Sequence, residues 1–221
     1  NVDTPTYRTQ TNFWSKIHYW WISTLPMRYK KQYQRMWSFA HKLFGSKTPR
    51  QVTYWARKMI DNPKVKVRVF RTDDCYSGLT IGGHYEPDGR EKDIELNIHF
   101  NHDCNEVFFD HVSIEIFIME LFTTYVHEKR HRYQYRSRGN VYGPVYRCHN
   151  EIRNKEQYRE LNYYGDPDEI DAYALEAAIE NKLRNTDFVV AKYRELFAEL
   201  DTKVYNRFLK KRYKFLNRIT L

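Results

Sequence analysis

Apolar and polar residues alternate along this chain with two different periods, which predict different elements. Between residues 110 and 137 the apolar residues recur every three to four positions, at Ile114, Phe117, Ile118, Leu121, Phe122 and Tyr125. The segment has no Pro or Gly, so the spacing predicts a long helix with one buried face. Asp110 is a candidate N-cap. The β-branched run at 112–119 would also suit a strand, but the length of the segment favours a helix.

A period of two replaces the helical pattern between residues 65 and 100. The alternating apolar residues are Val65, Val67 and Val69 in a first stretch and Ile94, Leu96, Ile98 and Phe100 in a second. Each stretch predicts a half-buried strand. A third strand around 79–86 would end at the turn Pro87-Asp88-Gly89. We therefore expect a small antiparallel β-meander that leads directly into the long helix.

Helical patterns also flank this central region. Residues 27–44 and 49–60 predict two helices separated by Gly45-Ser46-Lys47-Thr48, with Pro49 opening the second. After a loop at 139–149, helices are expected near 150–161, 167–184, 187–199 and 201–219. Small residues in the second of these would allow close packing on another helix: Ala172, Ala174, Ala177 and Ala178.

The predicted fold class is α+β: mostly helical, with a small antiparallel meander packed on the long helix. Residues 1–26 are polar and aromatic and include Trp14, Trp20 and Trp21, which suggests an N-terminal arm. Residues 27–221 are expected to form a single domain whose C-terminal helices are basic. The chain is long enough to bury a sizeable core in one domain.

One motif on the long helix carries recognisable chemistry. His127-Glu128-Lys129-Arg130-His131 has the HExxH pattern of zinc hydrolases. Residues four apart share a helix face, so both imidazoles can reach one metal ion. Glu128 lies about 100° around the helix, where it can act on water without being a ligand. The alternative interpretation is a charged, solvated turn of helix.

The rest of that helix face is polar, as expected of a cleft wall and equally of a solvated surface. At 100° per residue it gathers Glu120, Thr123, Thr124, His127, His131, Gln134 and Arg138. A catalytic zinc usually takes three protein ligands, so we expect a third ligand downstream. Glu169 and Asp171 are the best-placed carboxylates of the 167–184 helix. Their alternative role is capping, with Asp166 and Glu169 forming a capping box.

The composition constrains the setting of the protein. A net charge of +9 and 17% aromatic residues suit contacts with nucleic acid, a cell wall or a virion, although a solvated basic surface with aromatics in the core explains them equally well. Cys75, Cys104 and Cys148 have no ligand spacing, which fits a reducing compartment. No apolar run approaches 18 residues and no signal peptide is visible, so we expect a cytoplasmic or virion-associated protein without a membrane span. The start at Asn1 is compatible with a lost N-terminal segment.

The order of elements and motifs resembles the minimal zincin metallopeptidases of the Glu-ligand (gluzincin) branch, and is similar to short bacterial and phage peptidases of the ImmA/IrrE type. The likeness spans residues 60–185. It rests on the HExxH motif and on Glu169-Ile170-Asp171-Ala172, which matches that group's acidic helix motif.

This resemblance implies one Zn²⁺ held by His127, His131 and Glu169, with Glu128 as general base. Asp171 would orient a histidine or be the ligand in place of Glu169. It also implies that substrate pairs with an edge strand before the motif helix, here residues 94–100.

Other residues have less definite roles. Gln134 is a candidate to support a histidine or contact substrate. The helix departs from the family pattern in being strongly basic; Lys129 and Arg132 point away from the ligand face, and Arg138 returns to it as a candidate for binding a substrate carboxylate. Candidate oxyanion donors are Tyr133, Tyr135, Tyr163, Tyr164, Tyr173 and His149.

Three functions follow from these observations. The first is a zinc metallopeptidase acting on a peptide or protein. The second is a phage or virion-associated endopeptidase acting on peptidoglycan, with the aromatic arm and basic charge used for docking. The third is a non-enzymatic basic structural or nucleic-acid-binding protein with a vestigial metal site.

Overall fold

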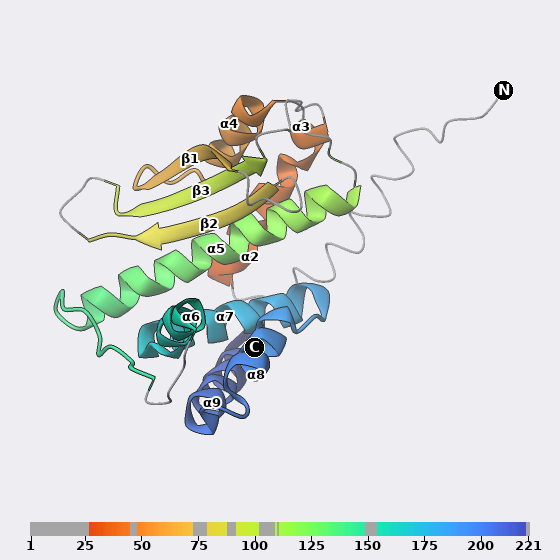
Figure 1. Cartoon of the computed structure of the whole chain (residues 1–221). Helices are drawn as coiled ribbons and strands as arrows, with labels where there is room; N and C mark the ends of the chain where they lie inside the picture. The colour runs from red at the N-terminus through yellow and green to blue at the C-terminus, as the bar shows by residue number, and fades with distance from the viewer. Residues whose placement is uncertain are drawn as a thin grey trace.

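A long central helix divides the molecule into a sheet side and a helical side (Figure 1). The structure is a computed structural model that describes residues 27–44, 48–72, 79–87, 92–101, 109, 111–148 and 154–219. The expected N-terminal arm, the candidate cap Asp110, the turn at 88–89 and His149 lie outside these residues.

The described elements follow the predicted order, except that the single helix predicted at 27–44 is two helices. The helices before the sheet are α2 (Met27–Ser38), α3 (Ala40–Phe44) and α4 (Pro49–Ile60). The strands are β1 (Val65–Thr72), β2 (Leu79–Tyr85) and β3 (Ile94–Asn101), and the central helix is α5 (His111–Ser137). The later helices are α6 (Lys155–Gly165), α7 (Pro167–Arg184), α8 (Phe188–Phe197) and α9 (Thr202–Ile219). The mostly helical α+β class is thereby confirmed.

The sheet is mixed, so the prediction of an antiparallel meander is wrong. The strand order is β1-β3-β2, with β3 parallel to β1 and antiparallel to β2. All four apolar residues of β3 are completely buried. In a meander the central strand would be β2, whose Gly82-Gly83 pair offers no side chain to the core. Burial of apolar surface therefore favours β3 in the middle.

Helix α5 is buried on both of its long faces. All six residues of the predicted apolar stripe are at most 4% exposed, and they join the core beneath the sheet. On the opposite face Thr123, His127 and Gln134 are also buried, because α7 packs against them. This part of the polar face of α5 is therefore a packed interface, whereas Arg138 near its C-terminal end is exposed.

The start of α7 decides what Glu169 can contact. The Asp166 side chain caps the helix by accepting a hydrogen bond from the Asp168 N–H at 3.2 Å. The Asp166 N–H donates to the carbonyl of Tyr163 and not to Glu169, so the predicted capping box does not form. The Glu169 carboxylate is left to face α5.

The helical side is held together by close packing around α7. Its four predicted small residues, Ala172, Ala174, Ala177 and Ala178, are completely buried. Helix α9 packs along α7, and the ring of its Phe208 stacks on Tyr193 of α8 with centroids 3.9 Å apart. Among the helices that the structure describes, none is long and apolar enough to cross a membrane.

Candidate metal centre

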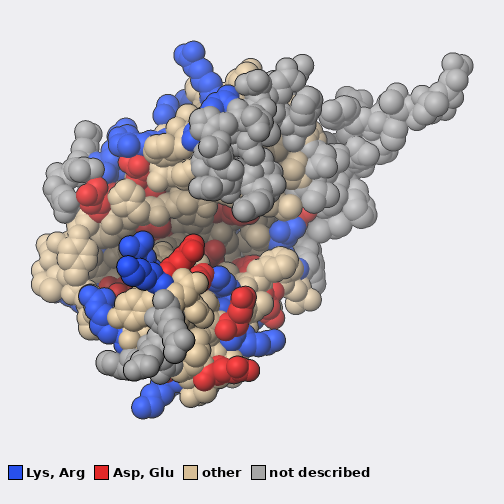
Figure 2. All heavy atoms as spheres, in the orientation of Figure 1, with Lys and Arg blue, Asp and Glu red and all other residues tan. Residues whose placement is uncertain are grey.

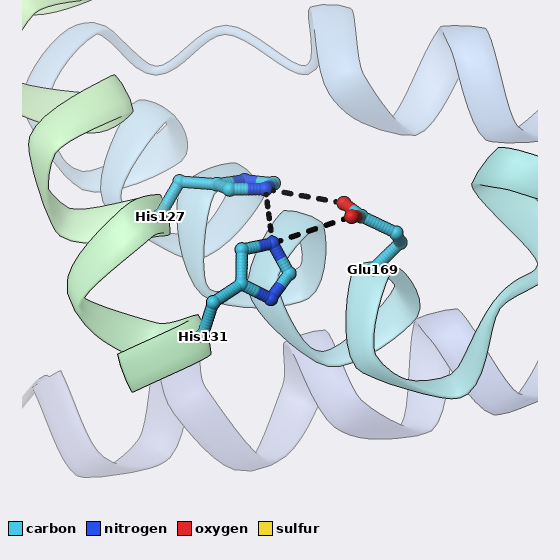
Figure 3. A group of neighbouring side chains, drawn as sticks. All are labelled: His127, His131 and Glu169. Carbon is cyan, nitrogen blue, oxygen red and sulfur yellow. Dashed lines mark hydrogen bonds and ion pairs between the residues drawn. The ribbon is translucent and has the colours of Figure 1, made fainter. Parts of the chain in front are cut away.

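Three side chains from two helices converge on one point (Figure 3). His127 and His131 extend from α5, and Glu169 extends from the first turn of α7. The His127 Nε2 lies 3.2 Å from one Glu169 oxygen and the His131 Nε2 lies 3.3 Å from the other. The two Nε2 atoms are 3.0 Å apart. The predicted trio thus forms a compact group of one oxygen and two nitrogen donors.

The spacing of these atoms fits a tetrahedral ion. Zinc binds nitrogen and oxygen at about 2.0–2.1 Å, which sets neighbouring ligand atoms of a tetrahedron about 3.3 Å apart. Each imidazole Nε2 lies close to that distance from one Glu169 oxygen, a different oxygen for each imidazole, and the two Nε2 atoms are 3.0 Å apart. One donor atom from each of the three residues lies within 4.8 Å of the others. Two imidazoles and one carboxylate form a ligand set typical of catalytic zinc. The residues present therefore fit the ion that the motif predicts.

The outer nitrogen of each imidazole is also bonded. The His127 Nδ1 lies 3.1 Å from a carboxylate oxygen of Glu176, and the His131 Nδ1 lies 3.0 Å from the Gln134 Oε1. Gln134 in turn donates to Asp171 at 3.1 Å. Such contacts fix the orientation of a metal-binding histidine and direct its Nε2 inward. Asp171 therefore contacts His131 only through Gln134 and lies outside the cluster.

Glu128 lies next to the cluster, beneath strand β2. It is 5% exposed, and its Oε2 has no hydrogen-bond partner among the described residues. Burial raises the pKa of Glu128, although the neighbouring histidines oppose this. Gly83 allows β2 to pass close by, since a Cβ there would lie 2.8 Å from both Glu128 Cγ and Thr124 Cγ2. A buried carboxylate with one unbonded oxygen suits a proton acceptor.

The two histidines of the cluster bind protons strongly when no metal competes, whereas Glu169 loses its proton readily. Burial disfavours a charged His127, but its hydrogen bonds with Glu169 and Glu176 prevail and raise its pKa to about 10. Burial also opposes a charged His131, but its hydrogen bond with Glu169 and the negative charges of Glu169 and Glu128 together raise its pKa. Burial opposes ionisation of Glu169, but both histidines prevail and lower its pKa to about 2. Glu169 is therefore held as a carboxylate, as a metal ligand must be.

A cavity of about 450 Å³ opens beside the cluster. Figure 2 shows this face hollowed between the half that holds the sheet and the half that holds the later helices. The walls include Glu128, His131 and Glu169 together with Gly83, His84 and Tyr85 of β2. Of the candidate oxyanion donors, Tyr135 and Tyr163 line this cavity, and the hydroxyl of Tyr163 lies next to Glu169. Tyr173 instead packs its ring on His127 at 4.5 Å.

The basic residues within the motif and directly after it have partners elsewhere in the chain. Arg130 donates to Asp171 at 2.5 Å, and Lys211 of α9 contacts the other oxygen of the same carboxylate at 2.6 Å. Arg132 contacts Asp93, which precedes β3. Lys129 lies over the Tyr125 ring. These contacts direct positive charge away from the cluster.

Arg138, predicted to return to the ligand face, pairs with Asp168 through both guanidinium nitrogens. A Cβ on Gly143 would lie 2.6 Å from Arg138 Nη1 and from Asp168 Oδ2, so the loop after α5 rests directly on this pair. The guanidinium is thus engaged within the chain and lines a cavity other than that of the cluster.

The strand beside the cavity is β2, so the implied edge strand at 94–100 is wrong. Residues 94–100 belong to β3, which is paired on both sides. Strand β1 forms one edge of the sheet, and Arg57 of α4 donates two hydrogen bonds to its Val67 carbonyl. Strand β2 forms the edge that borders the cavity.

Two contributors to the site were missed by sequence reasoning. Glu176 follows Glu169 by seven residues, or two helical turns, and this spacing could have placed both on one face of α7. Gly83 carries no motif, because its importance comes from the close approach of β2 to α5.

Comparisons of the chain with protein-family models, curated proteins and solved structures find no match.

The close approach at Gly83 predicts a specific sensitivity. Gly83→Ala should reduce the free energy of unfolding by about 1–3 kcal/mol, because the new methyl group overlaps Glu128 and Thr124. Gly82→Ala is the matched control, since the atom nearest to a Cβ at Gly82 is the His99 Nε2, 4.0 Å away. Urea denaturation measures both. Equal stability of the two variants would contradict the described packing of β2 on α5.

In the absence of metal, the pair of His127 and Glu169 should make stability depend on pH. The pKa of His127 is about 10 in the folded protein and 6.5 in the unfolded chain. Its contribution to the free energy of unfolding is therefore complete below pH 6.5 and is lost as the pH rises towards 10. The pKa of Glu169 is about 2 in the folded protein and 4.5 in the unfolded chain. Its contribution to the free energy of unfolding is therefore complete above pH 4.5 and is lost as the pH falls towards 2.

We therefore expect this pair to contribute most between pH 4.5 and 6.5. Urea denaturation in EDTA across this range and beyond measures the effect, with His127→Gln as the reference variant. The free energy of unfolding of the wild type should fall more steeply than that of His127→Gln above pH 6.5. Parallel pH profiles would show that the ion pair is not formed.

Proposed function

We propose that this protein is a zinc-dependent metallopeptidase. The observation that carries the proposal is the convergence of His127, His131 and Glu169 beside a buried carboxylate, Glu128, whose Oε2 has no partner in the described chain. A vestigial site has no need to keep both outer imidazole nitrogens bonded. The reaction class is hydrolysis of a peptide bond by activated water.

The three clustered residues would hold one zinc ion, with Glu176 and Gln134 orienting the imidazoles. A zinc ion bound there would lower the pKa of water towards neutrality and polarise the substrate carbonyl. Glu128, which lines the cavity, would accept a proton from the attacking water and return it to the leaving amine. The raised pKa of Glu128 suits both the uptake and the return of the proton, because a general base works best when its pKa is nearer to neutral pH.

Substrate would lie along β2. This strand forms the edge of the sheet beside the cavity, and an extended peptide can pair with such an edge through main-chain hydrogen bonds. Gly83 brings the backbone of β2 to Glu128, so a peptide paired there would pass close to the cluster. Tyr163, which also lines the cavity, would donate a hydrogen bond to the developing oxyanion.

Replacing the proton acceptor tests the proposal. Glu128→Gln should reduce cleavage of a peptide library by at least about a hundredfold, because general base catalysis contributes on this order. The zinc content should stay at one ion per chain, since Glu128 is not a ligand. Mass spectrometry of the products and of the metal measures both quantities. Glu115→Gln on the same helix is the control, because Glu115 pairs with Arg184 away from the cavity.

The outcomes separate the three functions. Loss of cleavage in Glu128→Gln alone supports the peptidase. If purified sacculi are cleaved and peptides are not, the substrate is peptidoglycan and the second function, an endopeptidase acting on the cell wall, is favoured. Cleavage unchanged in Glu128→Gln, or none in a zinc-loaded wild type, would contradict the proposal.

A further inference from the structure

The solvent-facing side of α9 is a continuous basic stripe. Helix α9 has no acidic residue, and six of its seven basic residues fall within an arc of about 100° at 100° per residue. These six are Lys203, Arg207, Lys210, Lys211, Lys214 and Arg218. With a rise of 1.5 Å per residue, the stripe is about 22 Å long.

The other face of α9 is occupied by the core. Val204, Phe208, Phe215 and Ile219 are all buried. A basic amphipathic helix often lies on a membrane with its apolar side chains inserted. Here those side chains are unavailable for insertion, because they already pack within the protein. The basic stripe is therefore the surface that α9 offers to a partner.

The stripe borders two cavities of about 200 and 150 Å³ between α9, α5 and α7. Six cationic side chains line them: Arg130, Arg138, Arg207, Lys211, Lys214 and Arg218. Only two carboxylates, Asp168 and Asp171, share these walls, so four positive charges are uncompensated locally. Arg207, Lys214 and Arg218 are exposed and have no ion pair among the described residues.

An aromatic side chain lies within the same surface. Tyr133 of α5 lines the larger cavity and is 60% exposed. The guanidinium of Arg130 lies 4.8 Å from its ring centroid, which holds the two side chains together. An exposed ring beside a row of cations offers stacking to a base while the cations contact phosphates.

We propose that the α9 stripe and the adjoining cavities bind a single strand of nucleic acid through its phosphate backbone, with Tyr133 as a stacking surface for a base. A linear row of cations suits a linear polyanion, and the buried apolar face of α9 removes the means of inserting into a lipid surface. The interaction is independent of sequence, because the contacts are to phosphate and to the flat face of a base.

Fluorescence anisotropy with a labelled single-stranded oligonucleotide tests this interaction. The wild type should bind, and the affinity should fall steeply with salt. The triple variant Arg207→Glu, Lys214→Glu and Arg218→Glu should bind at least about tenfold more weakly at 0.1 M salt. The slope of log affinity against log salt should decrease by about 2, as three lost contacts to a single strand require.

A matched variant controls for net charge. Arg50→Glu, Lys64→Glu and Lys155→Glu make the same charge change at exposed positions of other elements. This variant should keep the salt slope of the wild type. The proposal is overturned if the control variant loses as much affinity as the stripe variant, if the wild type does not bind, or if acidic phosphatidylserine vesicles bind it and the oligonucleotide does not.

The assay is run in EDTA, so it does not depend on zinc or on cleavage. A negative result would therefore leave the proposed peptidase untouched, and a failed peptidase would leave this result untouched. Tyr133→Ala supplies a second readout. It should weaken binding while leaving the salt slope unchanged, because stacking releases no counterions.

Discussion

The structure depends on the burial of a polar helix face. Helix α5 presents its apolar stripe to the core under the sheet and its histidines to α7, so ionisable side chains such as His127 are buried between the two helices. Burying ionisable side chains is costly unless each finds a partner. His127 meets that requirement through Glu169 and Glu176, and Arg130 does so through Asp171. The packing of α5 on α7 and the assembly of the cluster therefore depend on the same side-chain contacts.

That constraint explains features elsewhere in the chain. The four alanines of α7 are completely buried among the helices that pack on it, and the cap by Asp166 leaves Glu169 free to face α5. Arg132 and Arg138 connect α5 to other segments, Arg132 through Asp93 before β3 and Arg138 through Asp168 beneath the loop at Gly143. The basic residues that distinguish this helix from the family pattern therefore form ion pairs between α5 and neighbouring segments.

The sequence predicted the elements well because their signals are local. The helical spacing of α5, the Pro49 start of α4 and the HExxH motif each depend on residues within a few turns. The sheet order was predicted wrongly, because it depends on which strand buries most apolar surface, and that is a comparison between distant segments. Glu176 and Gly83 were missed for the same reason: one acts through an imidazole on another helix, and the other through the approach of a strand.

The metal content of the purified protein tests the central claim most directly. Equilibrium dialysis against Zn²⁺ should give one ion per chain in the wild type. Glu169→Gln should lose more than about a hundredfold in affinity, whereas Asp171→Asn, which contacts His131 only through Gln134, should lose about tenfold. No stoichiometric zinc in the wild type, or equal affinity in Glu169→Gln, would contradict the account.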